Sequence, residues 1–363
     1  MRSFAIWYKE KEDSKREHEN STEEKAKAKT GRLRETIIKE IIKELNLNTN
    51  NPENTNVAVD VHVNLIESAN KNKWYIDFGI KVQDISNVEI IYLFCPFPIK
   101  DVEEIADLTD VMDTKLLKAL FNENLTVVEG IAKRRLVKFS NDENPQVVVY
   151  RLDTTNEISL KHINEHEKCG TIVAIDTKDI LKPIHESTED VCKNYYFRFR
   201  IGIPDTGAEI INHEIEGISI ASCKFTKTEI IDFRLNNIRS IGDNAQDEIN
   251  KGEFFYLKSV HLLILKNAKD VLMYPSENPS TRMLEAELWQ QYLRGNKDND
   301  KEIEDLVAYH FKKKSTSRDN NISEYNVLAR FSSTTIPKYA IFWFIVFAIF
   351  LELACNALYD YLK

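Results

Sequence analysis

The sequence has few glycines and prolines, and it lacks the two common phosphate-binding loops. Ten glycines and nine prolines occur among 363 residues, and neither GxGxxG nor GxxxxGK[ST] is present. Both loops wrap backbone amides around a phosphate and need closely spaced glycines to do so. Their absence argues against the nucleotide-driven mechanisms that use these loops.

An excess of positive charge is also missing. Lys and Arg total 49 against 58 Asp and Glu, for a formal charge of -9. Proteins that bind nucleic acid gain most of their nonspecific affinity from neutralising phosphates. Nucleic acid is therefore not expected as a partner, and any phosphate binding must be local. The 42% of hydrophobic residues is enough for a sizeable core and excludes a disordered chain.

The sequence shows neither a secretory signal nor a disulfide framework. The first residues are followed at once by charged residues such as Lys9 and Glu10 rather than by an apolar run, so we expect the N-terminus to be cytoplasmic. No CxxC pair occurs. In the cytosol we expect reduced thiols at Cys95, Cys169, Cys192 and Cys223.

One long apolar run is present, from Tyr339 to Tyr359, interrupted only by Glu352 and Asn356. As a helix, 21 residues span about 31 Å, close to the thickness of a bilayer core. The run predicts a C-terminal transmembrane anchor, with a buried core helix as the alternative. Cationic residues concentrate before it, which predicts that the preceding side is cytoplasmic: Lys312, Lys313, Lys314, Arg318, Arg330 and Lys338.

The body of the chain reads mainly as strands. Few helical segments separate them, which argues against a doubly wound parallel sheet. We expect an α+β fold whose β-rich cytosolic domain is an antiparallel sandwich or a mixed sheet with flanking helices. The expected strands are 4–8, 57–63, 74–82, 88–94, 126–139, 146–152, 170–175, 195–203, 218–225, 230–235 and 254–265; the expected helices are 32–47, 102–108, 114–121, 282–293 and 302–311.

These elements predict four parts of the chain. Residues 1–56 hold a strand, a charged segment, an amphipathic helix and a linker, and residues 57–293 form the β-rich globular domain. Residues 294–338 hold a helix and a polar tether over 316–333. Residues 339–359 form the anchor.

Two patterns suggest metal chemistry, although the sequence indicates no definite cofactor. The string His162-Ile163-Asn164-Glu165-His166 resembles the inverzincin form of a zinc peptidase site. The resemblance implies a helix on which His162 and His166 bind zinc and Glu165 is the general base. The alternative is an exposed polar segment, because residues 156–168 show no apolar face.

The second metal pattern follows the apolar segment 172–175. Asp176 and Lys178 resemble the carboxylate-x-lysine element of restriction-type nucleases, and Asp153 is the best upstream acidic partner. The resemblance implies that the carboxylates hold Mg²⁺ and that the lysine stabilises charge. The alternative is a strand that ends in a solvated turn.

Aromatic and basic residues alternate over 195–200. In a strand, Arg198 and Arg200 would lie on one face and the aromatic rings on the other. This predicts an anion-binding face for a nucleotide or other phosphorylated ligand, to which Arg234 and Arg239 could add. The alternative is a core of aromatic rings with solvated or paired arginines.

The anchor itself carries polar groups on one side. Glu352, Cys355, Asn356 and Tyr359 follow at i, i+3, i+4 and i+7. A carboxylate in hydrocarbon is costly unless it is paired, which predicts self-association through this side. The alternative is that Glu352 extends toward the far headgroups.

Together these features favour a binding protein over an enzyme. We expect a tail-anchored protein whose cytosolic domain recognises a small anionic ligand or a protein partner, and whose anchor oligomerises in the bilayer. By analogy of architecture, this suits a bacterial stress or antiviral defence effector. The other hypothesis is a membrane-tethered hydrolase that depends on zinc or magnesium.

Overall fold

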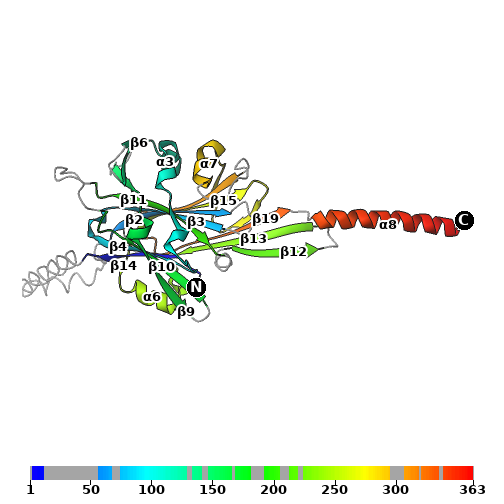
Figure 1. Cartoon of the computed structure of the whole chain (residues 1–363), viewed down its shortest axis with the longest axis horizontal. Coiled ribbons are helices and arrows are strands. Elements are labelled where there is room, and N and C mark those ends of the chain that lie inside the picture. Colours follow the sequence, from blue (N-terminus) through cyan, green and yellow to red (C-terminus); the bar gives the residue numbers. More distant parts are fainter. Residues whose placement is uncertain are drawn as a thin grey trace, which may run out of the picture.

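The computed structural model describes residues 2–11, 56–67, 74–128, 133–140, 146–165, 168–180, 192–204, 212–219, 224–294, 306–318, 320–334 and 338–362. These residues form a strand-rich body from which one long helix projects (Figure 1). The predicted α+β class, with a mixed sheet and a C-terminal apolar helix, is confirmed. The helix expected over 32–47 lies outside the described residues.

The largest sheet has ten strands and carries the features on which the function depends. Its strand order is β17-β18-β15-β2-β3-β11-β8-β7-β6, and β5 pairs with β11. β15 runs parallel to β2, and β11 runs parallel to β8, so the sheet is mixed. The bounds are β2 (Ala58–Glu67), β3 (Trp74–Val82), β5 (Ile105–Asp107), β6 (Leu125–Val128), β7 (Arg134–Phe139), β8 (Gln146–Tyr150), β11 (Tyr195–Ile203), β15 (Tyr256–Asn267), β17 (Ser280–Met283) and β18 (Leu306–Lys314).

Two smaller sheets complete the described body. A five-stranded sheet has the order β14-β1-β4-β10-β9, and a four-stranded sheet has the order β12-β13-β19-β16. Strands of the first are β1 (Ala5–Glu10), β4 (Val88–Cys95), β9 (Ile158–Glu165), β10 (Lys168–Asp176) and β14 (Glu253–Phe254). Strands of the second are β12 (Asn212–Ser219), β13 (Lys224–Leu235), β16 (Val271–Pro275) and β19 (Tyr325–Thr334).

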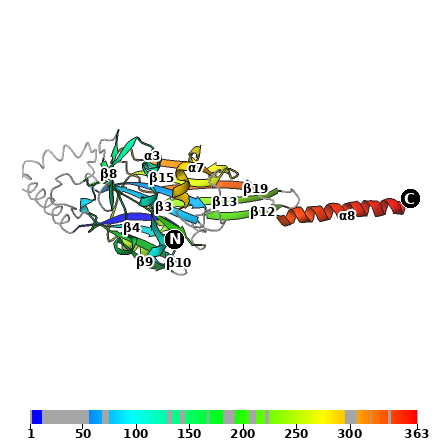
Figure 2. The same cartoon turned by 45° about the horizontal axis from the view of Figure 1, so that its top comes forward.

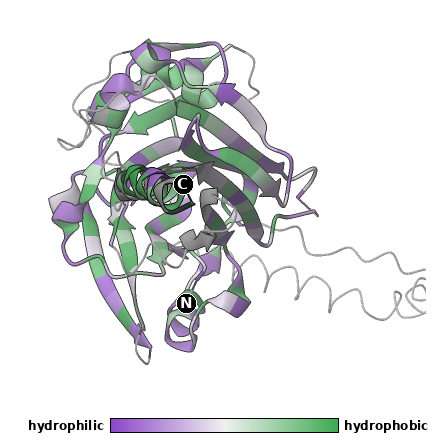
Figure 3. Ribbon diagram, turned by 90° about the vertical axis from the view of Figure 1, so that its right-hand side faces the viewer, coloured by the Kyte–Doolittle hydropathy of each residue, from purple (hydrophilic) through white to green (hydrophobic). Residues whose placement is uncertain are grey.

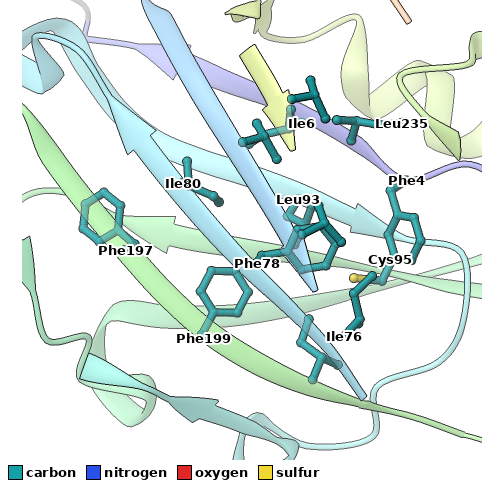
Figure 4. Close-up of a cluster of buried hydrophobic side chains, with 14 of the residues drawn as sticks. Phe4, Ile6, Ile76, Phe78, Ile80, Leu93, Cys95, Phe197, Phe199 and Leu235 are labelled. Carbon is teal, nitrogen blue, oxygen red and sulfur yellow. The ribbon is translucent and has the colours of Figure 1, made fainter. Parts of the chain in front are cut away.

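The main core lies where the three sheets meet. Phe4, just before β1, has its ring centroid 5.4 Å from that of Phe78 in β3 and 5.5 Å from that of Phe233 in β13. Figure 4 shows Phe4 and Phe78 with Leu93 of β4 and Phe199 of β11 in this cluster. The N-terminal strand therefore helps to close the core.

Two helices cover the other face of the ten-stranded sheet: α3 (Thr114–Phe121) and α7 (Ala286–Arg294) (Figure 1). Asp113 accepts a 2.7 Å hydrogen bond from the Leu116 amide and caps α3. Asn122 ends the helix in a left-handed conformation with φ 53°. Shorter helices are α4 (Thr154–Glu157) and α6 (Asp243–Ile249).

The C-terminal helix α8 (Lys338–Leu362) has 25 residues and extends beyond the ends of β13 and β19 (Figures 1 and 2). Its length is about 37 Å at the usual rise per residue. The stretch Phe342–Tyr359 is long and apolar enough to cross a membrane, and none of it is buried. Figure 3, which looks along α8, shows it mostly in the hydrophobic colour.

Several sequence-based expectations about local structure were wrong. Residues 102–104 form a single 3-10 turn and 105–107 form β5, where a helix was expected. The strand expected over 218–225 is divided between β12 and β13, and the one over 126–139 between β6 and β7.

The helix expected over 302–311 and the polar tether over 316–333 are also corrected. β18 and β19 occupy most of these residues. In β19, Tyr325, Val327, Ala329 and Phe331 are buried at every second position. The intervening polar residues lowered the apolar content and hid a half-buried strand.

Gly79 in β3 is needed for the packing above it. A Cβ atom on Gly79 would clash with Tyr196 Oη and would lie 2.7 Å from Arg198 Nη1, whereas one on Gly202 would find its nearest atom at 3.9 Å. We expect Gly79→Ala to lower the free energy of unfolding by about 1–3 kcal/mol. Gly202→Ala, the control, should leave it unchanged or raise it by up to about 1 kcal/mol. Urea unfolding of the detergent-solubilised chain measures both, and equal effects would contradict the close packing over Gly79.

Candidate functional site

One row of residues crosses five strands of the ten-stranded sheet, on the face that α3 and α7 cover. Arg198 in β11 lies opposite Gly79, which lies opposite His62 in β2. His62 lies opposite His261 in β15, and His261 lies opposite Lys312 in β18. Opposed residues of adjacent strands share a face. The pairing therefore aligns two cations and two imidazoles along one line.

A pocket of about 430 Å³ lies over this row, and we call it the cationic pocket. Its buried charged and polar side chains are Arg198, Trp289, Asn64 and His62, and its exposed ones include Arg282, Lys312, Lys314 and Glu123. An uncharged wall comes from the end of α3 and from β15. The full lining is His62, Val63, Asn64, Ala119, Leu120, Phe121, Asn122, Glu123, Arg198, His261, Leu263, Ser280, Thr281, Arg282, Trp289, His310, Lys312 and Lys314.

Positive charge dominates this pocket. Four of its residues are cationic, and Glu123 is its single acid. Among the residues that the structure describes, no carboxylate oxygen lies within 4 Å of the ammonium nitrogen of Lys312 or Lys314. Burial and the charge of Lys314 lower the pKa of Lys312. The lining of the pocket thus carries more positive than negative charge.

Three histidines lie side by side beneath these cations. The ring centroids of His62 and His261 are 4.8 Å apart, and His310 Nε2 is 3.2 Å from His261 Nδ1. Burial, with Lys312 next in effect, lowers the pKa of His261 to about 3. Burial and the neighbouring His261 lower the pKa of His62 well below its usual range. At neutral pH these rings are uncharged, and each can donate one hydrogen bond and accept another.

Two buried polar atoms of the pocket residues have no hydrogen-bond partner: His62 Nδ1 and Trp289 Nε1. Their side chains are 9% and 1% exposed. Buried polar atoms are normally paired, so an unpaired one calls for an explanation such as a bound molecule. Both residues line the pocket, where a ligand could supply the missing partners.

Two arginines of β11, Arg198 and Arg200, lie in a buried network with the carboxylate of Asp77. Arg200 makes a bidentate ion pair with Asp77, with N–O distances of 2.6 and 3.0 Å. Arg198 donates from Nε to Tyr292 Oη at 2.7 Å and from Nη1 to Tyr196 Oη at 2.9 Å. The Tyr292 hydroxyl in turn donates to Asp77 Oδ2 at 2.5 Å.

The charged groups of this network are all buried. Arg198 is 0% exposed, Arg200 is 2% exposed and Asp77 is 0% exposed. Burial raises the pKa of Tyr196 and of Tyr292, so both hydroxyls stay neutral and orient Arg198 without neutralising it. Two guanidinium groups and one carboxylate give this group of three a net charge of +1.

The structure places the two predicted arginines of β11 in different surroundings. β11 has the expected alternation, with Phe197 and Phe199 in the main core and the arginines on the opposite face. Arg198 lines the cationic pocket, whereas Arg200 is held by Asp77. Neither arginine is solvated, because α7 covers this face and supplies Tyr292.

Arg234 and Arg239 lie elsewhere. Arg234 is in β13 of the four-stranded sheet and pairs with Asp232, with N–O distances of 2.9 and 2.6 Å. Arg239 lies in the turn after β13. Neither lines the cationic pocket. The structure therefore does not bring them together with Arg198.

Sequence reasoning missed the histidines and assigned Lys312 and Lys314 only to the flank of the anchor. The one signal in the sequence for these histidines was that His62 and His261 each stand alone in an apolar strand. It becomes informative only when the pairing of β2 with β15 is known.

The helical zinc motif is corrected by the structure. His162 and Glu165 lie in strand β9, which pairs with β10 along its length, so they are not on a helix. His166 lies outside the described residues. Glu165 Oε1 accepts a 2.8 Å hydrogen bond from the Asp243 amide at the start of α6. Among the described residues, no group of three His, Cys, Asp or Glu is arranged to hold a metal ion.

The residues of the nuclease-like pattern make local contacts at the ends of strands. Asp153 caps α4, accepts from the Asn156 amide at 3.3 Å and forms a 3.3 Å ion pair with Lys133. Asp176 accepts a 2.9 Å hydrogen bond from the Lys178 amide. The contact between Asp176 and Lys178 is typical of a strand that ends in a turn. This is the alternative to a magnesium site that the sequence also allowed.

The polar residues of the anchor, Glu352, Cys355, Asn356 and Tyr359, all lie in α8 and are exposed. Their helical spacing places them along one side. Self-association through this side stays a prediction.

Removal of the buried Asp77 carboxylate should lower the stability of the fold strongly. Asp77→Asn removes the carboxylate that forms the bidentate ion pair with buried Arg200, and we expect it to lower the free energy of unfolding by about 3–5 kcal/mol. Asp232→Asn is the control, because its partner Arg234 is partly exposed. It should cost less than about 1 kcal/mol. Urea unfolding followed by circular dichroism measures both, and similar losses would show that the buried charges are compensated in another way.

Comparison of the sequence with models of known protein families finds no match. Comparison with curated proteins also finds no match. The function of the chain is therefore inferred from the cationic pocket and the C-terminal helix.

Proposed function

We propose that this protein is a membrane-anchored binding protein that recognises a small anionic ligand in the cationic pocket. The observation that carries the proposal is the excess of cationic side chains there: Arg198, Arg282, Lys312 and Lys314 line the pocket, and Glu123 is the one acid that does. An anion bound there would be attracted by several cations at once.

The electrostatic attraction between these cations and an anion is large enough to contribute substantially to binding. Opposite unit charges 4 Å apart attract by about 4 kcal/mol at the effective dielectric typical of partly buried sites. Among the described residues, no carboxylate forms an ion pair within 4 Å of Lys312 or Lys314, so a ligand would not need to break one. Neutral histidines beside them can donate hydrogen bonds to the same anion.

The dimensions favour a small molecule. At about 430 Å³ the pocket falls within the range of roughly 300–1,000 Å³ typical of small-molecule sites. Its walls come from β2, β15, β17, β18, α3 and α7, which surround the ligand on several sides.

The anchor would hold this pocket near a membrane, on the cytosolic side. Only residues 335–337 separate β19 from α8, so Thr334 and Lys338 are at most about 14 Å apart. The excess of Lys and Arg before α8 favours a cytosolic body. The four-stranded sheet then leads directly into the bilayer, without the long tether expected from the sequence.

Association of anchors is the second half of the proposal. Glu352 and Asn356 would bond across copies in the bilayer, where unpaired polar groups are costly. An oligomer whose cytosolic domains bind a small anion suits an effector that responds to a ligand, in a stress or antiviral defence setting.

The pocket lysines provide the direct test. We expect the full-length protein in detergent to bind pyrophosphate, and Lys312→Gln/Lys314→Gln to bind it at least tenfold more weakly, measured by isothermal titration calorimetry at constant ionic strength. Lys313→Gln is the matched control, because Lys313 lies between these lysines on the other face of β18 and does not line the pocket. Equal loss in the control, or an unchanged affinity in the double variant, would contradict the proposal.

The anchor is tested separately. Glu352→Leu should abolish oligomers of the full-length protein, read by native mass spectrometry in detergent, because it removes the polar group that needs a partner. Phe350→Leu alters an apolar residue on the opposite side of α8 and should leave the oligomers intact. Oligomers that persist in Glu352→Leu would contradict association through this side.

A further inference from the structure

Part of the cationic pocket carries no charge. Leu120 and Phe121 come from the last turn of α3, and Leu263 comes from β15. All three are half-buried and face the space that the cations surround. A site for an inorganic anion alone needs no such wall, since apolar surface gains only from contact with an apolar part of a ligand.

The charged and uncharged parts come from different elements. Lys312 and Lys314 are two residues apart on β18, and Arg282 lies on the adjacent β17. The apolar wall comes mainly from α3. This division fits a ligand with a strongly anionic part and an apolar or planar part.

The planar part must also carry hydrogen-bonding atoms. Trp289 Nε1 is a buried donor without a partner, and it can pair only with an acceptor. His62 Nδ1 is the other buried unpaired atom. The ring of His62 lies 5.8 Å from that of Phe121, which contributes an aromatic surface to the same wall.

We propose, building on the proposed function, that the ligand is a nucleotide with at least two phosphates. The phosphates would lie against Lys312, Lys314 and Arg282, and the base against Leu120, Phe121 and Leu263. Trp289 Nε1 would donate to a ring nitrogen or carbonyl oxygen of the base. Side-chain cations would then replace the glycine-rich loops that this sequence lacks.

The test separates the two parts of the ligand. Calorimetry on the full-length protein in detergent would compare pyrophosphate, the common nucleosides and the corresponding nucleoside diphosphates. We expect at least one diphosphate to bind tenfold or more tightly than pyrophosphate, and its nucleoside to bind more weakly than either. Pyrophosphate that binds as tightly as every diphosphate would overturn the nucleotide assignment and leave the anionic-ligand function standing. Failure of all three classes to bind would overturn both.

Variants locate the base. Trp289→Phe keeps an aromatic ring but removes the donor, so it should weaken diphosphate binding about tenfold and leave pyrophosphate binding unchanged. Leu120→Ala should show the same selectivity by trimming the wall. Retained pyrophosphate binding shows in each case that the variant is folded. Equal weakening of both ligands, or of neither, would overturn the placement of the base.

Discussion

A buried network joins Arg200, Asp77, Tyr292 and Arg198, and the cationic pocket depends on it because it fixes Arg198 in the pocket lining. Asp77 satisfies Arg200 in a bidentate pair, while Arg198 is held by two neutral tyrosine hydroxyls. Gly79 leaves room for this arrangement, because a Cβ atom there would reach Arg198. Helix α7 completes it by bringing Tyr292 over the sheet. The fold thus holds the Arg198 guanidinium in a fixed position in the lining of the pocket.

The strands that carry the pocket are also joined to the sheet that leads to the anchor. Lys266 of β15 is 2% exposed and makes ion pairs with Glu67 of β2, at 2.8 Å, and with Glu229 of β13. β13 pairs along its length with β19, the strand before α8. A buried ion pair of this kind leaves little freedom between the ten-stranded and four-stranded sheets, so the pocket and strand β19 belong to one packed body.

Local periodicity made much of the fold predictable. The bounds expected for β3, β11 and α3 agree with the structure, because each has a regular apolar period. The sequence did not predict β18 and β19 because lysines and other polar residues interrupt the apolar period of these two strands. The candidate site was harder to predict: the alternation of β11 indicated that Arg198 is on a shared face, but the pocket needs His62 and His261 to meet through a parallel pairing of strands far apart in the sequence. Nothing local to either histidine specifies that pairing.

The most direct test of the account is to locate a bound anion. Crystals of the full-length protein soaked in tungstate, a heavy tetrahedral anion, would show its position by anomalous scattering. The account predicts a strong peak in the cationic pocket, in contact with Lys312 or with the His62–Arg198 side. An unoccupied pocket, with tungstate bound instead at surface cations such as Arg239, would contradict it.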